Sequence, residues 1–344
     1  MRLYIHIGSG KTGSTTIQAW CRKNRVELEK YSARYLGLYF EETPHYSPIK
    51  DINAHQKFFR DLRSNKGEAA TNLRKVFPLI VKDAQADGID TLIWSNEALF
   101  SAYNELGEAI AEISNYVPVT LVAYIRRQES WLMSAYQQWG IKHKTVRGRV
   151  PDFGSWVKEW IAECDYTAIF SAWEKYVGRE NITIGIVERT DNMVSDFCDR
   201  CGLEIDLSDQ NDVSTNVRLR NTQASLYKLY NDCFPEPKQQ AEMQSFISRT
   251  GLGSKVFDDA DSSLGYPDWD TLEKVAAHFT AGNETLARYA REGEDLSFPD
   301  LKKQNPPDNE ISNDALISAL LMSLVNCESR IAHLEHTLAS LQAE

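Results

Sequence analysis

A glycine-rich segment near the start of the chain has the composition of an anion-binding loop. The residues Gly8-Ser-Gly-Lys-Thr-Gly-Ser-Thr15 follow an alternating, β-forming run at Arg2–Ile7 and precede a run with helical spacing. A loop between a strand and a helix N-terminus exposes several backbone N–H groups, and the helix dipole favours negative charge there. Lys11 adds a positive charge, and Ser14 and Thr15 add hydroxyl donors. We therefore expect this loop to bind a phosphate-type anion.

The loop departs from the Walker A pattern of kinases and ATPases. That pattern places a glycine five residues before its Gly-Lys pair, and Ile5 occupies the corresponding position here. A Walker site also needs an aspartate for magnesium at the end of a neighbouring strand. The stretch after the strand expected at 91–94 offers only Glu97. A P-loop kinase is therefore a weak alternative.

The loop also matches the dinucleotide-binding pattern GxGxxG. The three glycines are Gly8, Gly10 and Gly13, and the acidic pair Glu41–Glu42 follows. In a Rossmann domain the acidic residue follows the glycine motif by about 20 residues. Glu41 and Glu42 lie further from the motif than that. The lysine at position 11 argues against this reading, but an NAD(P)-dependent oxidoreductase stays open as the main alternative.

The stretch Ile5-His-Ile-Gly-Ser-Gly-Lys-Thr-Gly-Ser-Thr-Thr-Ile-Gln18 resembles the 5′-phosphosulfate loop of sulfotransferases. The resemblance implies that the donor is 3′-phosphoadenosine-5′-phosphosulfate (PAPS) and that the product is the 3′,5′-bisphosphate PAP. It implies that Lys11 interacts with the bridging oxygen of the phosphosulfate. The donor-binding residues implied within the loop are Gly8, Gly10, Lys11, Thr12, Gly13, Ser14 and Thr15.

A second motif of the same family follows the apolar run Pro118–Ile125. Sulfotransferases carry an arginine at this strand end and a serine eight residues later, and both bind the 3′-phosphate of the donor. Arg126 and Ser134 match that spacing. An arginine at the carboxyl end of a buried strand lies where α/β proteins bind ligands, and its guanidinium forms charge-assisted bonds with phosphate. The chain has Arg127-Gln128 where the family often has Asn-Pro or Asp-Pro, and in this it resembles bacterial, carbohydrate-type members.

The likeness extends over residues 2–232 and is specific at the two motifs. The stretch Asn216-Val-Arg-Leu-Arg220 resembles a family segment that approaches the nucleotide, which implies donor contacts from Arg218 and Arg220. The region 235–344 resembles no known family. The implied acceptor is a hydroxyl on a carbohydrate, a glycoconjugate or a glycolipid.

Transfer to a hydroxyl needs a general base. The first candidate is Glu97, which follows the strand expected at 91–94 and so lies at the same sheet edge as the loop. An alternative role for Glu97 is to cap a helix at 98–103. The second candidate is His45, in a loop.

A run of basic residues follows the helix that carries Ser134. Lys142, Lys144 and Arg147 are candidates to contact an acidic acceptor, such as a uronic-acid glycan or a phosphorylated lipid head. The alternative is a solvated charged surface, which is the usual role of such runs.

Strands alternate with helices along the first two hundred residues, which predicts a parallel α/β fold. The run Pro118–Ile125 is apolar on both faces, as in a parallel sheet covered by helices on both sides. We expect a P-loop-type central parallel sheet flanked by helices, with a mainly helical C-terminal region.

The expected strands are Arg2–Ile7, Thr91–Trp94, Pro118–Ile125 and Ile182–Val187. The expected helices are Ala69–Ala86, Leu106–Tyr116, Ser130–Trp139 and 193–201, and we expect Pro78 to kink or divide the first of them. Residues 32–65 are expected to be irregular.

The C-terminal third has a different character. We expect one α/β domain at 1–295, with 205–295 mainly helical, then a polar linker at 296–312 and a helix at 313–344. Within that helix, apolar residues from Leu320 to Leu341 recur in steps of four and three, which is coiled-coil spacing. This permits self-association, or packing of a terminal helix on its own domain. A non-catalytic scaffold that uses this helix to assemble, with a vestigial nucleotide fold, is a further alternative.

The bulk composition limits the partners. The chain has 344 residues and a formal charge of −11, so we expect no nucleic-acid partner. No run is long and apolar enough for a membrane span, and no basic, apolar leader opens the chain, so we expect a cytoplasmic protein.

Six cysteines include one CxxC, Cys198–Cys201, in a helical pattern. No second CxxC or histidine pair follows at zinc spacing, so we expect core thiols and no metal.

Overall fold

The computed structural model divides into two compact units, which are described separately. The first unit comprises Met1–Trp131, Ile161–Val217 and Val275–Leu301, and the second comprises Leu132–Trp160, Arg218–Lys274 and Lys302–Glu344. The residues described are 1–43, 67–207, 221–238, 241, 243, 245, 269–300, 324, 325, 327–331 and 333–335.

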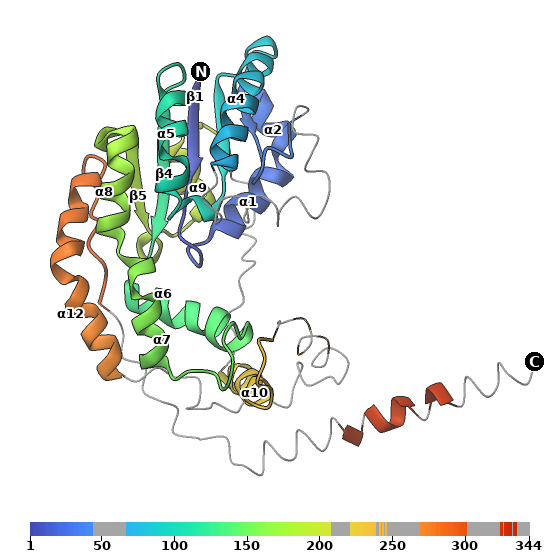
Figure 1. The fold of residues 1–344 in the computed structure, drawn as a ribbon. Coiled ribbons are helices and arrows are strands. Elements are labelled where there is room, and N and C mark those ends of the chain that lie inside the picture. Colours follow the sequence, from blue (N-terminus) through green and yellow to red (C-terminus); the bar gives the residue numbers. More distant parts are fainter. Residues whose placement is uncertain are drawn as a thin grey trace, which may run out of the picture. The chain divides into compact units, whose positions relative to one another are not determined.

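The first unit contains a five-stranded, fully parallel sheet in the order β2-β3-β1-β4-β5. Figure 1 labels β1, β4 and β5 of this sheet. The strands are β1 (Arg2–His6), β2 (Ala33–Tyr35), β3 (Thr91–Ser95), β4 (Val119–Ile125) and β5 (Ile182–Ile186). Strand β1 lies between β3 and β4, and the chain reverses its direction of winding there. A loop after β1 therefore leaves the sheet at a topological switch point, where open α/β sheets bind ligands.

Helices cover both faces of this sheet, which confirms the expected α/β architecture. On one face, α1 (Ser14–Lys23) packs against α9 (Met193–Arg200) and α2 (Arg25–Lys30). On the other, α5 (Tyr103–Ser114) packs against α4 (Glu68–Ala86) and α8 (Tyr166–Val177). Every residue of β5 is buried, and β4 is buried except at Thr120. Burial of both faces explains why these strands read as continuous apolar runs.

The structure corrects three expectations about secondary structure. Strand β2 lies within the segment expected to be irregular. It has only three residues, too few to show alternation, and its pairing with β3 defines it. Helix α4 is not divided at Pro78, because buried residues such as Leu73, Phe77 and Ile80 hold one continuous face against the unit. The helix expected at Ser130–Trp139 is α6 (Gln128–Ala135) followed by a π-helix, Tyr136–Lys142.

The CxxC motif is part of the core, as expected. Cys198 and Cys201 are buried with Cys21 in one apolar cluster between the sheet, α1 and α9. All three are free thiols, and burial raises the pKa of each. A buried thiol with a raised pKa is a poor nucleophile, so this motif is structural.

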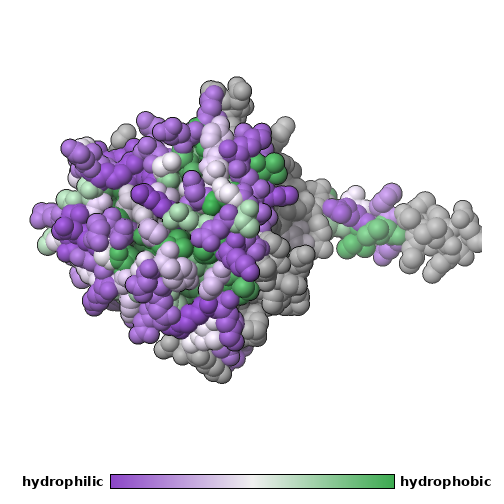
Figure 2. Space-filling view, turned by 90° about the horizontal axis from the view of Figure 1, so that it is seen from above, coloured by the Kyte–Doolittle hydropathy of each residue, from purple (hydrophilic) through white to green (hydrophobic). Residues whose placement is uncertain are grey.

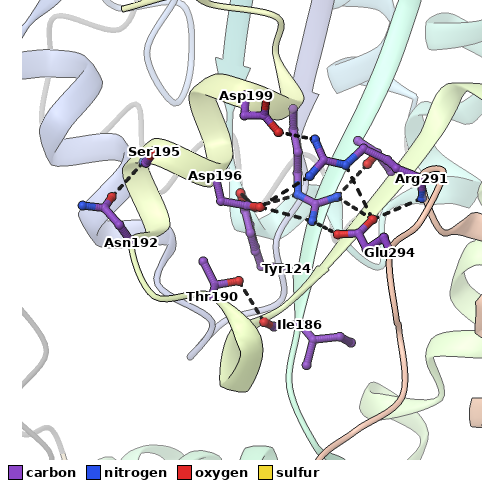
Figure 3. Close-up of polar contacts among 11 residues, drawn as sticks. Tyr124, Ile186, Thr190, Asn192, Ser195, Asp196, Asp199, Arg291 and Glu294 are labelled. Atoms are coloured by element: carbon purple, nitrogen blue, oxygen red, sulfur yellow. Dashed lines mark hydrogen bonds and ion pairs between the residues drawn. The ribbon is translucent and has the colours of Figure 1, made fainter. Parts of the chain in front are cut away.

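A buried ion-pair network fastens the segment after α12 to the core of the first unit (Figure 3). Arg200, whose side chain is 2 % exposed, forms an ion pair with Asp196 and a second with Glu294. Its Nη1 also donates to Thr183 Oγ1 at 2.8 Å, and Tyr124 donates to Asp196 at 2.5 Å. The guanidinium is thus satisfied by groups from α9, from β5 and from the 290s.

Helix α12 (Trp269–Thr285) leads into that segment. In Figure 1 it runs beside α8, and Thr167 Oγ1 donates to the carbonyl oxygen of Gly282 at 2.9 Å. Residues 296–300 open the expected linker, and in the first unit they are held: Leu296 is buried and Arg189 bonds to Ser297. The remainder of the expected linker, 301–312, lies outside the described residues, so the domain boundaries stay a prediction.

The described part of the second unit is helical and rich in aromatic residues. It contains the π-helix, α7 (Phe153–Trp160) and α10 (Asn221–Asp232), and both helices pack on the π-helix. The rings of Trp139, Trp156 and Trp160 stack in series. The described C-terminal residues are helical, with Leu324, Ile331 and Leu334 exposed. Within the described parts of both units, no helix has the length and apolarity that crossing a membrane requires.

Candidate functional site

The glycine-rich loop connects β1 to α1 through two residues in the left-handed region of backbone space. Gly13 has φ +88°, and Lys11 has φ +70°. Thr12, which is buried, closes the turn by donating its hydroxyl to the Ser9 carbonyl oxygen. Non-glycine residues with positive φ are uncommon and cost about 1–2 kcal/mol. A lysine held in this conformation is typical of a site where side-chain position matters more than backbone stability.

Two side chains that follow β4, Arg126 in the connection to α6 and Trp131 in α6, hold carbonyl oxygens of the loop. Trp131 Nε1 donates to the Gly10 carbonyl oxygen at 2.7 Å. Arg126 Nη1 donates to the Lys11 carbonyl oxygen at 3.2 Å. Both carbonyl oxygens are thus paired with hydrogen-bond donors. Their partial negative charge is therefore partly neutralised and repels less an anion that is bound by the loop N–H groups. The structure therefore brings the two sequence motifs, the loop and Arg126, together at one sheet edge.

Glu188 was not anticipated from the sequence. Its Oε1 lies 3.7 Å from Arg126 Nε and accepts from the Arg127 backbone N–H at 3.2 Å. Tyr166 donates its hydroxyl to the Arg126 carbonyl oxygen at 2.8 Å. Arg126 Nε is buried and has no hydrogen-bond partner among the described residues. The arginine is thus positioned from three sides and keeps hydrogen-bonding capacity for an anion.

Glu97 follows β3 and opens a short 3₁₀ helix, Glu97–Leu99. The cap of that helix is Asn96, whose side chain accepts from the Ala98 backbone N–H at 3.0 Å, so Glu97 has no capping role. The Glu97 side chain reaches solvent, yet the protein around it desolvates the carboxylate and raises its pKa, and the charge of Lys11 partly offsets this. Glu97 is therefore close enough to Lys11 for their charges to interact.

Two buried polar atoms beneath the loop lack hydrogen-bond partners among the described residues. They are Ser14 Oγ, on the first residue of α1, and His6 Nε2, on the last residue of β1. Ser14 is 2 % exposed and His6 is fully buried. Buried polar groups in native proteins are almost always paired, so these atoms fit a loop whose ligand supplies the missing partner.

The other expected donor contacts are not placed with the loop. Ser134 is half-buried on α6, in the second unit, and its proximity to Arg126 stays a prediction. His45, Arg218 and Arg220 lie outside the described residues.

The structure corrects the expected basic patch. Lys144 is 1 % exposed, and its ammonium donates to the carbonyl oxygens of Asn231 and Phe234 within the second unit. It binds the end of α10 and is unavailable to an acceptor. Lys142 is half-buried, with its pKa lowered by burial. Arg147 is exposed and forms an ion pair with Glu236 at 3.3 Å. A charge run in the sequence thus contains one structural lysine.

A separate cavity of about 500 Å³ lies in the first unit between the start of α6, α12 and residues 294–298. Its polar lining is largely paired: Arg127 with Glu129, and Gln128 with Asn283. No residue of the glycine-rich loop lines it. Among the residues that the structure describes, no cluster of three histidine, cysteine or acidic side chains could hold a metal ion.

Sequence reasoning missed Trp131, Glu188, His6 and Ser95 as parts of this site. Trp131 had a usable signal, because it stands one helical turn after Arg127 at the start of the helix that follows the arginine motif. His6 stands two residues before the loop, but its burial and its pairing with Ser95 are set by the sheet. Glu188 and Ser95 reach the site through strand pairing and the folding of distant segments, which leave no local pattern.

No protein-family model matches the sequence, and a search of curated proteins found no match. Among solved structures, the chain is similar to a sulfotransferase from Alicyclobacillus acidocaldarius, with a TM-score of 0.35 and 11 % sequence identity. The similarity covers 66 % of this chain and 90 % of that one.

Proposed function

We propose that this protein is a sulfotransferase that moves the sulfuryl group of PAPS to an acceptor hydroxyl. The observation that carries the proposal is the hydrogen bond from Arg126 to the Lys11 carbonyl oxygen. It joins two motifs, 115 residues apart, that resemble the 5′- and 3′-phosphate sites of one enzyme family. Neither motif alone separates a sulfotransferase from other nucleotide-binding proteins, but the two together fit a 3′,5′-bisphosphate.

The loop and the two cations have separate tasks in this reaction. The loop N–H groups and the hydroxyls of Ser14 and Thr15 hold the 5′-phosphate, and Arg126 holds the 3′-phosphate. The sulfur–oxygen bond to the phosphate breaks while a bond to the acceptor oxygen forms. Negative charge then grows on the phosphate oxygen that leaves, and the Lys11 ammonium stabilises it. The strained backbone of Lys11 fits a side chain whose direction is fixed in advance.

Glu97 takes the acceptor proton in this proposal. A carboxylate with a raised pKa is a stronger base than an ordinary one. The desolvation that raises the pKa of Glu97 therefore suits this role. The acceptor class is a carbohydrate or glycoconjugate, on the resemblance to carbohydrate-type sulfotransferases, and Lys142 and Arg147 remain candidates to contact an acidic one.

Isothermal titration with PAP, beside NAD, NADP and ATP, tests the donor site. We expect PAP to bind and the others to bind weakly, and Arg126→Ala to weaken PAP about tenfold to a hundredfold, as for loss of bonds to a charged group. Arg147→Ala serves as the matched control, because Arg147 is exposed in the second unit. Binding of a dinucleotide without PAP would replace this proposal with a Rossmann oxidoreductase. Binding of no nucleotide would favour the scaffold.

We further propose that the C-terminal helix pairs with a second copy of the chain. Figure 2 shows hydrophobic atoms along one side of the described C-terminal segment and hydrophilic atoms on the other. Leu324, Ile331 and Leu334 are 56 to 65 % exposed there. In the heptad defined by these residues, Arg330 takes position g and Glu335 the following position e, which pair across a parallel dimer.

Sedimentation of the full chain tests this pairing. We expect a dimer that Ile331→Asp converts to monomer. Arg330→Glu or Glu335→Arg alone should weaken the dimer, and the double exchange should restore it. A monomeric native chain, or single exchanges without effect, would exclude the parallel pair.

We place the reaction in the cytoplasm. The support is the state of the cysteines: all six are free thiols, and four of them are buried. Disulfides form and persist mainly in oxidising compartments.

A further inference from the structure

Beneath the glycine-rich loop lies a buried histidine, His6, with no role in the reaction proposed above. It is the last residue of β1 and pairs in register with Ser95 of β3. The rings of Tyr124 and Phe197 meet its ring edge to face, at centroid distances of 5.8 and 5.6 Å. Burial lowers its pKa to about 3, so the imidazole is neutral at physiological pH. Neither a charge nor proton transfer to solvent explains a histidine here.

The hydrogen bonds around His6 determine which ring nitrogen carries its proton. Nδ1 lies 2.8 Å from Ser95 Oγ. Ser95 is fully buried, and among the described residues Nδ1 is the one acceptor near its hydroxyl. With the proton on Nδ1, the Ser95 hydroxyl would be a buried donor without an acceptor among the described residues, which costs about 1–3 kcal/mol. With the proton on Nε2, the hydroxyl donates to Nδ1, and Nε2–H is the donor that needs an acceptor when the loop holds its anion. We assign the proton to Nε2 for that bound state.

Nε2 is directed at the start of the loop and of α1. A Cβ built on Gly8 would lie 2.6 Å from His6 Nε2 and 3.1 Å from Ser14 Oγ. Both atoms therefore border the small space that Gly8 leaves by lacking a side chain. Both are buried, and neither has a hydrogen-bond partner among the described residues. A donor N–H and a hydroxyl thus face one space at the anion-binding end of α1.

We infer that His6 is a positioning residue that directs the Ser14 hydroxyl at the anion bound by the loop, an inference that deepens the proposed function and rests on it. In the anion-bound state Ser95 donates to His6 Nδ1, His6 Nε2–H donates to Ser14 Oγ, and the Ser14 hydroxyl donates to the 5′-phosphate; without the anion the bond between Nε2 and Ser14 is not formed. Each donor polarises the next, and the chain ends on negative charge. His6 keeps one proton throughout, and it acts on the ligand only through Ser14.

A double-mutant cycle on PAP binding, measured by isothermal titration, tests this arrangement. His6→Leu and Ser14→Ala should each weaken PAP about tenfold, as for loss of one bond to a charged group. Because both changes break the same chain, the double variant should bind no worse than Ser14→Ala alone. Losses that multiply, or a His6→Leu variant that binds PAP as the native protein does, would overturn the inference.

Two further variants separate hydrogen bonding from packing. His6→Gln keeps an amide N–H near the position of Nε2 and should retain more affinity than His6→Leu. Phe197→Leu disturbs the packing on the His6 ring without removing a donor, and should leave PAP affinity unchanged. If Phe197→Leu weakens PAP as much as His6→Leu does, His6 only fills space.

Nuclear magnetic resonance of the ¹⁵N-histidine native protein tests the tautomer of His6 directly. The His6 signals, assigned by their loss in His6→Gln, should show the neutral Nε2–H tautomer, and the Nε2–H signal should shift on saturation with PAP. A neutral Nδ1–H tautomer, or an imidazolium, would overturn the inference.

Pyrophosphate titrated in parallel keeps the two proposals distinguishable. Coupled losses for pyrophosphate without PAP binding would support the His6 chain and overturn the PAPS donor. PAP binding without coupling would support the donor and overturn the His6 chain. Binding of neither anion would overturn both.

Discussion

The first unit contains two buried polar clusters on the same side of its sheet, and they differ in how completely they are satisfied. Around Arg200, every nitrogen of the guanidinium has a partner, from Asp196, Glu294 or Thr183. Beneath the glycine-rich loop, His6 Nε2 and Ser14 Oγ have none among the described residues. A fully paired cluster is explained by the fold it stabilises. An incomplete cluster of similar burial leaves room for a group outside the described residues, such as a bound anion, to complete it.

The backbone shows the same contrast. Arg200 lies near the end of a regular helix, α9, in an ordinary conformation. Lys11 adopts a positive φ that costs stability. Natural proteins accept such costs mainly where function needs them. The two clusters therefore make opposite predictions for substitution, one for stability and the other for binding and turnover.

The largest expected effect is on stability, at the paired cluster. Arg200→Ala removes one member of a buried network and leaves the carboxylates of Asp196 and Glu294 without it. We expect the free energy of unfolding to fall by about 3–5 kcal/mol, measured by urea denaturation. Arg291→Ala is the control, since Arg291 joins the same network but is 38 % exposed, and it should cost about 1 kcal/mol or less. Equal losses in the two variants would remove the distinction between the clusters.

The next largest effect is expected on turnover, at Lys11 in the loop above the incomplete cluster. Lys11→Gly removes the ammonium and lets glycine take the positive φ. Sulfuryl transfer should fall about 10²–10³-fold, as for loss of one group that stabilises developing charge. The free energy of unfolding should rise by about 1 kcal/mol, because the strain is relieved. Activity assays with labelled donor and thermal unfolding check both parts. An active variant would contradict the proposed mechanism, and a destabilised one would contradict the account of strain.

The pH dependence of turnover sharpens the assignment of Glu97. The base must be ionised, so activity should fall as the pH decreases through the pKa of Glu97. Because that pKa is raised, the fall should begin at a higher pH than for an ordinary glutamate. Glu97→Gln should lower the rate about a hundredfold or more and abolish this acid limb. If the limb persists in the variant, another group is the base.

A smaller effect is expected from a single methyl group at the loop. Gly8→Ala places a Cβ 2.6 Å from His6 Nε2, so the ring or Ser14 must shift. The expected cost to folding is about 1–3 kcal/mol, as for overpacking a filled site, with weaker PAP binding. Gly148→Ala is the control, since its Cβ would meet nothing within 4 Å, although its positive φ carries its own smaller cost. If Gly8→Ala matches the native protein in stability and in PAP binding, the space between Gly8, His6 and Ser14 accommodates a methyl group without any shift.

The smallest effect belongs to the exposed end of the basic run. Arg147→Glu breaks an ion pair whose two side chains are 82 and 59 % exposed. Stability should change by less than about 0.5 kcal/mol. If Arg147 contacts an acidic acceptor, the KM for that acceptor should rise in Arg147→Glu while the affinity for PAP stays constant. An unchanged KM would remove Arg147 from the acceptor site.

The sequence allowed the fold class and the loop to be predicted because both depend on local patterns. Alternation and apolar runs define strands buried on one or both faces. Three glycines and a lysine between a strand and a helix define an anion loop. Arg126 was singled out because its spacing from Ser134, after a buried strand, resembles a sulfotransferase motif. Each of these features is encoded within about a dozen consecutive residues.

Only the tertiary structure decided which polar residues act together. It buried Lys144 against the end of α10, although the sequence shows it amid exposed basic residues. It brought Glu188 to Arg126, and Ser95 to His6 across two neighbouring strands. The physical reason is that desolvation and hydrogen-bond satisfaction are set by neighbours far apart in the chain. Residue types and spacing therefore predicted an anion-binding loop, and the packing of distant segments determined which polar groups surround that loop.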